Sequence, residues 1–238
     1  MVTVSVSPSG MSFVAFDFDG TLTDFRAADR AAIELVRQQT APAVPPEVFL
    51  DVAVEEIVAF HARVDAGLEN PLDLHRVRFG RLRHRFGMTS TPTSALVHRY
   101  LAELFARTVP VAGARAVLRR LRTDGTRIAI VSNAYDAGEQ RGRISACFPE
   151  IDFDAIVIAA ECAAPKPDRA PFDRLLALLD ASAAEGLYVG DLPEYDVPGA
   201  RAVGLRTVIV SGSVQARARA VAMGAEVCAS LPGLIGVL

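Results

Sequence analysis

Residues Phe13–Leu22 read FVAFDFDGTL, and this stretch is the strongest structural signal in the 238-residue chain. Phe13–Phe16 form a short apolar run, the pattern of a buried strand when a turn follows it. Asp17 and Asp19 come directly after the run and, two residues apart on an extended backbone, project to the same side. Gly20 then permits a tight turn. The stretch therefore predicts two carboxylates at the end of a buried strand, the edge at which open α/β sheets bind ligands.

In the second half of the chain strands alternate with helices. We predict a helix that ends at Asp124-Gly125 and others around 172–179, 197–203 and 214–223, but none between Asn133 and Phe153. Such an alternation predicts a Rossmann-like α/β core, a parallel sheet with helices on both faces. Polar residues follow two of the strands, Ser132-Asn133 in one case and Gly190-Asp191 in the other. In a parallel sheet these ends lie beside Asp17. The strands predicted after the first are Arg127–Val131, Phe153–Ile158, Gly186–Val189, Arg206–Val210 and Glu226–Cys228.

Helical periodicity replaces the α/β pattern between Leu22 and Pro110. We predict helices over 27–39 and 47–66, a third that ends at Gly87 and a fourth around 97–105. The chain therefore divides into an α/β core domain and an inserted all-α domain of helical-bundle type. The predicted core comprises residues 11–24 and 109–238, and the predicted insertion residues 25–108.

Composition narrows the class of protein and its partners. A net charge of −3 implies no general affinity for nucleic acid polymers or anionic membranes. No apolar run is long enough to cross a bilayer, and residues 1–10 lack the basic and apolar regions of a signal peptide, so that Met11 is a candidate start. The three cysteines lack metal-site spacing, so we expect a cytoplasmic protein. A monomer and a homodimer are equally compatible with the sequence.

Lys166 is the only lysine in a chain that otherwise uses arginine, and it lies in a loop after the third strand. Carboxylates clustered at one sheet edge repel one another unless a positive group sits among them. The candidates are Lys166 and a hard dication with oxygen ligands. Mg²⁺ fits best, because it takes one or two carboxylates together with phosphate oxygens and water.

Four motifs in this order resemble those of the haloacid dehalogenase-like (HAD) hydrolases. The DFDGT of Asp17–Thr21 resembles the first motif and the IVSN of Ile130–Asn133 the second. Lys166-Pro167 resembles the third, and the GDLPEYD of Gly190–Asp196 resembles the fourth. Leu192 departs from the pattern, since relatives often carry Ser, Thr or Asn there.

The resemblance implies an Mg²⁺-dependent phosphomonoester hydrolase that acts on a small phosphorylated metabolite through an aspartyl-phosphate. Asp17 would be the nucleophile and Asp19 the general acid and base, while Lys166 would stabilise the transferred group. The inserted helices would be a C1-type cap that closes over the site. The implied phosphate-binding residues are Ser132, Asn133 and Lys166. The implied metal ligands are Asp17, Asp191 and the backbone carbonyl of Asp19. The implied supporting residues are Thr21, Gly190 and Asp196, of which Asp196 would either support the metal ligands or orient Lys166.

Several alternatives stay open within and outside this family. A dehalogenase has no use for an acid at Asp19, and a phosphonate hydrolase would need a lysine in the insertion. A phosphosugar mutase keeps the same motif and is not excluded, and an inert regulatory module would have lost a motif carboxylate. Substrate identity is open among nucleotides, sugar phosphates and phosphoglycolate-like esters. The arginines at 76, 78, 81, 83 and 85 are expected mainly on a solvated, salt-bridged face, with at most two reaching a ligand.

Overall fold

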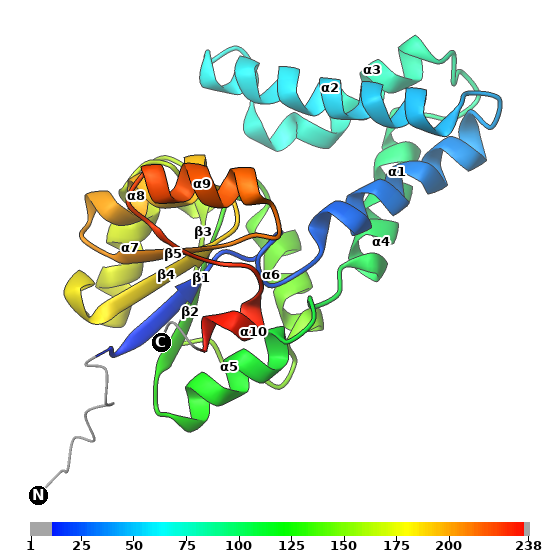
Figure 1. Cartoon of the computed structure of the whole chain (residues 1–238). Coiled ribbons are helices and arrows are strands. Elements are labelled where there is room, and N and C mark those ends of the chain that lie inside the picture. Colours follow the sequence, from blue (N-terminus) through cyan, green and yellow to red (C-terminus); the bar gives the residue numbers. More distant parts are fainter. Residues whose placement is uncertain (1–10, 236–238) are drawn as a thin grey trace, which may run out of the picture. The chain divides into compact units, whose positions relative to one another are not determined.

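The computed structural model describes residues 11–235, so the expectations for residues 1–10 lie outside it (Figure 1). The described chain forms two compact units. One runs to Asp24 and resumes at Pro110, and the other is Phe25–Val109. The second unit begins at the first residue of the predicted insertion and ends one residue later than predicted. No helix of the described residues is long and apolar enough to cross a membrane.

The first unit is built on a six-stranded parallel sheet with the order β3-β2-β1-β4-β5-β6. Its central strand β1 pairs with β2 and β4, so that Phe16 lies opposite Ile130 on one side and Val189 on the other. Parallel pairing brings the carboxyl ends of all these strands to one edge. The predicted parallel α/β core is confirmed. The strands are β1 (Phe13–Phe16), β2 (Arg127–Ser132), β3 (Ala155–Ile158), β4 (Gly186–Gly190), β5 (Arg206–Val210) and β6 (Glu226–Cys228).

Helices cover both faces of the sheet, which explains why β1 is apolar at every position. Val14 and Phe16 face a core shared with α5, α6 and α10, whereas Phe13 and Ala15 face a core shared with α7 and α8. Helix α9 packs against α8, β5 and β6. The helices of this unit are α5 (Ala114–Thr123), α6 (Ala137–Cys147), α7 (Ala170–Leu179), α8 (Pro193–Ala202), α9 (Val214–Ala222) and α10 (Leu231–Leu234).

The second unit is all-α and has its own apolar core, to which Ile33, Phe49, Phe79 and Tyr100 contribute. Its most unusual member is Arg78, which is fully buried. This unit consists of α1 (Phe25–Thr40), α2 (Pro46–Asp65), a short 3-10 helix at Pro71–Asp73, α3 (Leu74–Arg85) and α4 (Thr93–Arg107).

The structure differs from the sequence predictions mainly at polar helices and at element ends. Helices α6 and α10 were not predicted. Strand β3 begins at Ala155 rather than Phe153, whose ring instead meets Phe148 edge-on at 6.1 Å. Helix α8 begins at Pro193 rather than Val197, because a proline in the first turn gives up no helical hydrogen bond.

Candidate active site

Asp17 lies at the end of β1, on the edge where the parallel strands finish. Its backbone N–H donates to the carbonyl of Val189 in β4 (2.8 Å), which continues the pairing by one residue, and its side chain is buried. The chain then turns back sharply: the N–H groups of Leu22 and Thr23 both donate to the Phe18 carbonyl, at 3.0 and 3.1 Å. This turn directly follows the buried side chain of Asp17.

Lys166 reaches the same point from the loop after β3, and its side chain is also buried. Its Nζ donates to Asp17 Oδ1 (2.7 Å), Asp196 Oδ1 (2.8 Å) and the Tyr188 hydroxyl (2.7 Å). These three acceptors match the three N–H donors of an ammonium. The structure thus brings Asp17, Lys166 and Asp196, which are far apart in sequence, into direct contact.

Asn133 contacts the main chain of Lys166 through its side-chain amide. Its Nδ2 donates to the Lys166 carbonyl (2.8 Å), and its Oδ1 accepts from the Lys166 N–H (2.9 Å). The loop that carries Lys166 is therefore tied to the end of β2. Thr21 Oγ1 lies 3.4 Å from Asp17 Oδ2, a long contact on the opposite side of that carboxylate.

Asp196, in the first turn of α8, connects Lys166 to the loop after β4. While Oδ1 accepts from Lys166, Oδ2 accepts from the N–H groups of Asp191 (3.1 Å) and Leu192 (2.9 Å). Gly190 is required here, because a Cβ at this position would lie 2.2 Å from Asp196 Oδ2. The Asp196 carboxylate thereby shapes the loop that presents Asp191.

Tyr188 was missed by sequence analysis. It lies in β4 on the same face as Ala15, and its hydroxyl donates to Asp196 Oδ1 (2.9 Å) while accepting from Lys166. The available signal was a polar-tipped aromatic residue inside a fully buried strand, since a buried tyrosine hydroxyl normally has a hydrogen-bond partner.

The site holds more negative than positive charge. Burial raises the pKa of Asp17 to about 8; Lys166 opposes this shift, and Asp196 and Asp191 add to it. Although burial disfavours the charged form of Lys166, the carboxylates Asp17 and Asp196 raise its pKa above the ordinary value. The site therefore holds three carboxylates, Asp17, Asp191 and Asp196, and one ammonium, which contacts two of them, and a bound cation would offset the excess negative charge.

The oxygen donors around Asp17 suit a hard dication. A Cβ at Gly20 would lie 2.6 Å from Asp191 Oδ2, so glycine, here with φ +97°, lets the Asp191 carboxylate lie against the loop of Asp17 and Asp19. No cluster of three or more His, Cys, Asp and Glu side chains with metal-site geometry occurs in residues 11–235. The carboxylates of Asp17 and Asp191 offer only oxygen donors, which suit Mg²⁺ completed by water and phosphate, whereas zinc sites draw on nitrogen and sulfur ligands.

Asp19 is held by α6, a helix that the sequence did not predict. Arg143 pairs with both of its carboxylate oxygens, Nη1 with Oδ1 at 2.6 Å and Nη2 with Oδ2 at 2.8 Å. Gln140 donates to Asp19 Oδ2 (2.9 Å) and also to Ser132 Oγ (2.8 Å). The predicted residues Asp19 and Ser132 are thus joined through a side chain that sequence analysis missed.

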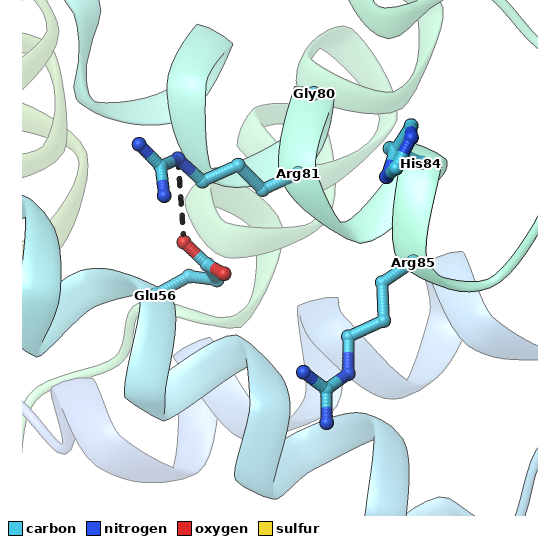
Figure 2. Close-up of a pocket in the computed structure, with 5 residues that line it drawn as sticks. All are labelled: Glu56, Gly80, Arg81, His84 and Arg85. Carbon is cyan, nitrogen blue, oxygen red and sulfur yellow. Dashed lines mark ion pairs between the residues drawn. The ribbon is translucent and has the colours of Figure 1, made fainter.

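The helical unit contains a hollow of its own, of about 550 Å³, lined by charged side chains of α2 and α3 (Figure 2). Arg81 pairs there with Glu56 (3.5 Å), and Gly80, His84 and Arg85 complete the lining. Of the other arginines in this segment, Arg76 pairs with Asp73, Arg78 is buried against Asp29, and Arg83 donates to the Thr91 carbonyl. The Glu56 carboxylate of this hollow is paired with Arg81, whereas the buried carboxylates of Asp17 and Asp196 lie at the edge of the sheet.

The sequence of this chain is similar to those of known hydrolases. A family model described as haloacid dehalogenase-like hydrolase matches residues 11–204. A phosphoglycolate phosphatase of Cereibacter sphaeroides is 33% identical over 201 residues, which cover 82% of this chain and 83% of that protein. The glyceraldehyde 3-phosphate phosphatase of Pyrococcus abyssi is 30% identical over 205 residues, covering 82% and 79%.

Other matches are partial or structural. The match to the haloacid dehalogenase-like hydrolase domain-containing protein 3 of Bos taurus, 35% identical over 100 residues, spans 42% of this chain and 39% of that protein. The HAD-hydrolase YfnB from Bacillus subtilis, in a structure bound to magnesium, superposes with a TM-score of 0.74. That superposition covers 96% of this chain and 98% of the other at 21% identity, so it shows a shared fold.

Proposed function

Because the chain belongs to the haloacid dehalogenase-like hydrolases, and within them to the phosphatases, we propose that it hydrolyses phosphomonoesters of small metabolites with Asp17 as the nucleophile. The observation that carries this proposal is the Asp17 carboxylate itself. It is buried at the end of the central strand, with Oδ1 held by Lys166 and a second carboxylate, Asp19, two residues away. A nucleophile oriented by one group and accompanied by a separate acid is the arrangement that two-step displacement needs.

In the first step an oxygen of Asp17 attacks phosphorus, and the bond from phosphorus to the ester oxygen breaks. Asp19 gives its proton to that leaving oxygen, which departs as an alcohol. In the second step Asp19 accepts a proton from water as the water attacks the aspartyl-phosphate. Inorganic phosphate leaves and the Asp17 carboxylate is restored, so atoms and protons balance.

The other residues at this edge of the sheet bind the phosphoryl group and orient it for attack. Lys166 places its positive charge where negative charge grows on the phosphoryl oxygens, and the Ser132 hydroxyl and the Asn133 N–H are proposed as further donors. Mg²⁺ would be held by Asp17, Asp191 and the Asp19 carbonyl, and when bound it would offset the charge of the phosphoryl group and the surrounding carboxylates. Thr21, Gly190 and Asp196 support this set.

For the substrate we propose a short phosphorylated acid or aldehyde, since two relatives that match 82% of the chain, at 33% and 30% identity, are named for phosphoglycolate and glyceraldehyde 3-phosphate. The helical unit is proposed as the cap that selects it, the role implied by its place between the first and second motifs. Asp19 counts against a dehalogenase, because a departing halide takes no proton. A phosphosugar mutase would return the phosphoryl group to sugar instead of releasing it.

Phosphate release from a panel of esters, with and without Mg²⁺, tests the proposal. The panel contains 2-phosphoglycolate, glyceraldehyde 3-phosphate, a hexose phosphate, a nucleoside monophosphate and p-nitrophenyl phosphate. We expect Mg²⁺-dependent release from at least one small ester, and a loss of more than about 10³-fold in Asp17→Asn, because the nucleophile is removed. Full turnover by a folded Asp17→Asn protein would contradict the assignment. Transfer of phosphate to a second sugar position without release would identify a mutase.

A further inference from the structure

The buried side of α6 is half polar, which is costly for a helix on a sheet. Its inward residues are Gln140, Arg143, Ile144 and Cys147, and Gln140 is fully buried while Arg143 is 4% exposed. A buried guanidinium destabilises a fold unless it is paired and hydrogen-bonded. Both polar residues find their partner in Asp19, more than 120 positions earlier in the chain.

Arg143 is constrained on several sides. Its two terminal nitrogens form the bidentate pair with Asp19, its Nε lies 2.7 Å from Glu139 Oε1, and its plane lies over the Phe18 ring with 5.6 Å to the ring centre. A bidentate pair fixes the plane of a carboxylate as well as its position. Asp19 lies in a loop, and besides this pair its carboxylate accepts only from Gln140 (2.9 Å) and, in a long contact, from Thr23 Oγ1 (3.5 Å) among the hydrogen bonds of residues 11–235.

Gln140 extends the constraint to the second motif. Its amide nitrogen donates to Asp19 Oδ2 and Ser132 Oγ, and its amide oxygen accepts from Arg143 Nη2. Only one orientation of the amide satisfies all three neighbours. Gln140 therefore sets the distance between the acid–base carboxylate and the hydroxyl at the end of β2.

We propose that Arg143 and Gln140 are positioning residues for Asp19: together they hold the general acid and base at a set place relative to the Ser132 hydroxyl. This inference rests on the proposed function, because it assigns Asp19 a proton-transfer role. Proton transfer requires hydrogen-bond reach to the leaving oxygen, and a displacement of about 1 Å can cost ~100-fold in rate.

The test compares two kinds of ester, since only a poor leaving group needs the proton. In Arg143→Met we expect kcat for the best alkyl phosphate of the panel to fall by about 100-fold and kcat for p-nitrophenyl phosphate by less than about tenfold, with KM little changed. Gln140→Leu should show the same selectivity more weakly. The matched control is Arg141→Met, an exposed arginine of the same helix that pairs with Glu161 (3.0 Å) and should leave both activities unchanged.

A double-mutant cycle separates positioning from general support of the fold. If Arg143 acts through Asp19, adding Arg143→Met to Asp19→Asn should cause no further loss of alkyl phosphate turnover. Equal losses on both esters, or losses that multiply in the double variant, would overturn the inference. Should Arg143→Met fail to fold, Gln140→Leu and Arg143→Lys decide by the same ester comparison. A wild-type protein inactive on every ester would instead overturn the proposed function.

Discussion

The three oxygen atoms around Lys166 Nζ are arranged so that only the ammonium group of a lysine can donate to all of them. Three oxygen acceptors, two from carboxylates and one from a tyrosine, surround a single nitrogen at 2.7–2.8 Å. A tetrahedral ammonium can point one N–H at each of them. A guanidinium is planar and directs its donors in a fork, so it cannot reproduce this arrangement within the same space. This explains why a chain that uses arginine elsewhere carries its one lysine here.

We therefore expect Lys166→Met to lower kcat by about 10²–10³-fold, the loss that follows removal of one strong electrostatic donor. Lys166→Arg should recover less than about tenfold of this loss, because the positive charge returns without the geometry. Phosphate release under saturating Mg²⁺ measures both effects, and thermal melts establish that the variants are folded.

Tyr188→Phe serves as the control, since it removes the uncharged partner of Lys166 and keeps both ion pairs. Its effect on kcat should be less than about tenfold, in line with one neutral hydrogen bond. Near-normal turnover in a folded Lys166→Met protein would show that this lysine has no part in catalysis.

At the scale of the element, α6 shows why a functional helix can escape prediction. Helical periodicity is read from apolar residues at i, i+3, i+4 and i+7. In α6 these positions are Gln140, Arg143, Ile144 and Cys147, so the two polar residues that contact Asp19 erase half of the apolar pattern. The sequence predicted Asp17, Asp19, Lys166 and Asp191 because each follows a strand or stands in a motif. It could not predict Gln140 and Arg143 as partners of Asp19, because they lie more than 120 residues away from it in the chain.

Arg78 gives a second case, in which the charge pattern of α3 predicted a solvated face. Its Nε donates to the Ala53 carbonyl of α2 (3.0 Å), its Nη1 pairs with Asp29 of α1 (3.1 Å), and its guanidinium lies over the ring of Tyr100 in α4. One side chain of α3 thus contacts the three other helices of the unit. An arginine at helical spacing among exposed arginines gives no sequence signal of burial.

We expect Arg78→Met to destabilise the protein by about 3 kcal/mol, because the change leaves the Ala53 carbonyl and the Asp29 carboxylate short of a buried donor. Arg76→Met is the matched control: Arg76 lies in the same helix but is exposed, and its solvent-screened pair with Asp73 should contribute little to the free energy of unfolding. Urea unfolding followed by far-UV circular dichroism measures both. Equal, small changes in the two variants would mean that the buried pair contributes nothing net.

At the scale of the molecule, the chain builds one α/β unit from two segments and places an all-α unit between them. The change from strand–helix alternation to pure helical periodicity made this division predictable, since each unit buries its own apolar set. Substrate identity was not predictable by the same reasoning. Under the proposed role of the helical unit as a cap, substrate choice would be set by side chains of that unit. Its charged residues, such as those lining the hollow of Figure 2, have the sequence pattern of an ordinary helix surface.

A divalent cation should raise the thermal stability of the protein, and a variant that loses this effect identifies the residue that binds the cation. A ligand that binds only the folded state at a hundred times its Kd adds about 2.7 kcal/mol, which for a chain of this size raises Tm by about 5–10 °C. We expect Mg²⁺ to raise the Tm of the wild-type protein by such an amount, and EDTA to reverse the rise and abolish turnover. Asp191→Asn should lose the Mg²⁺ response.

The metal-free proteins give the decisive comparison, because without Mg²⁺ the Asp191→Asn substitution should not lower Tm. Without a cation, the charge of Asp191 adds to the negative charge that raises the pKa of Asp17. Removing its charge should then leave Tm unchanged or slightly higher, although the same substitution abolishes stabilisation by Mg²⁺. Scanning calorimetry of both proteins, with and without the metal, tests this reversal. A lower Tm of Asp191→Asn in EDTA would show that Asp191 supports the fold. An undiminished response to Mg²⁺ would show that the cation binds elsewhere.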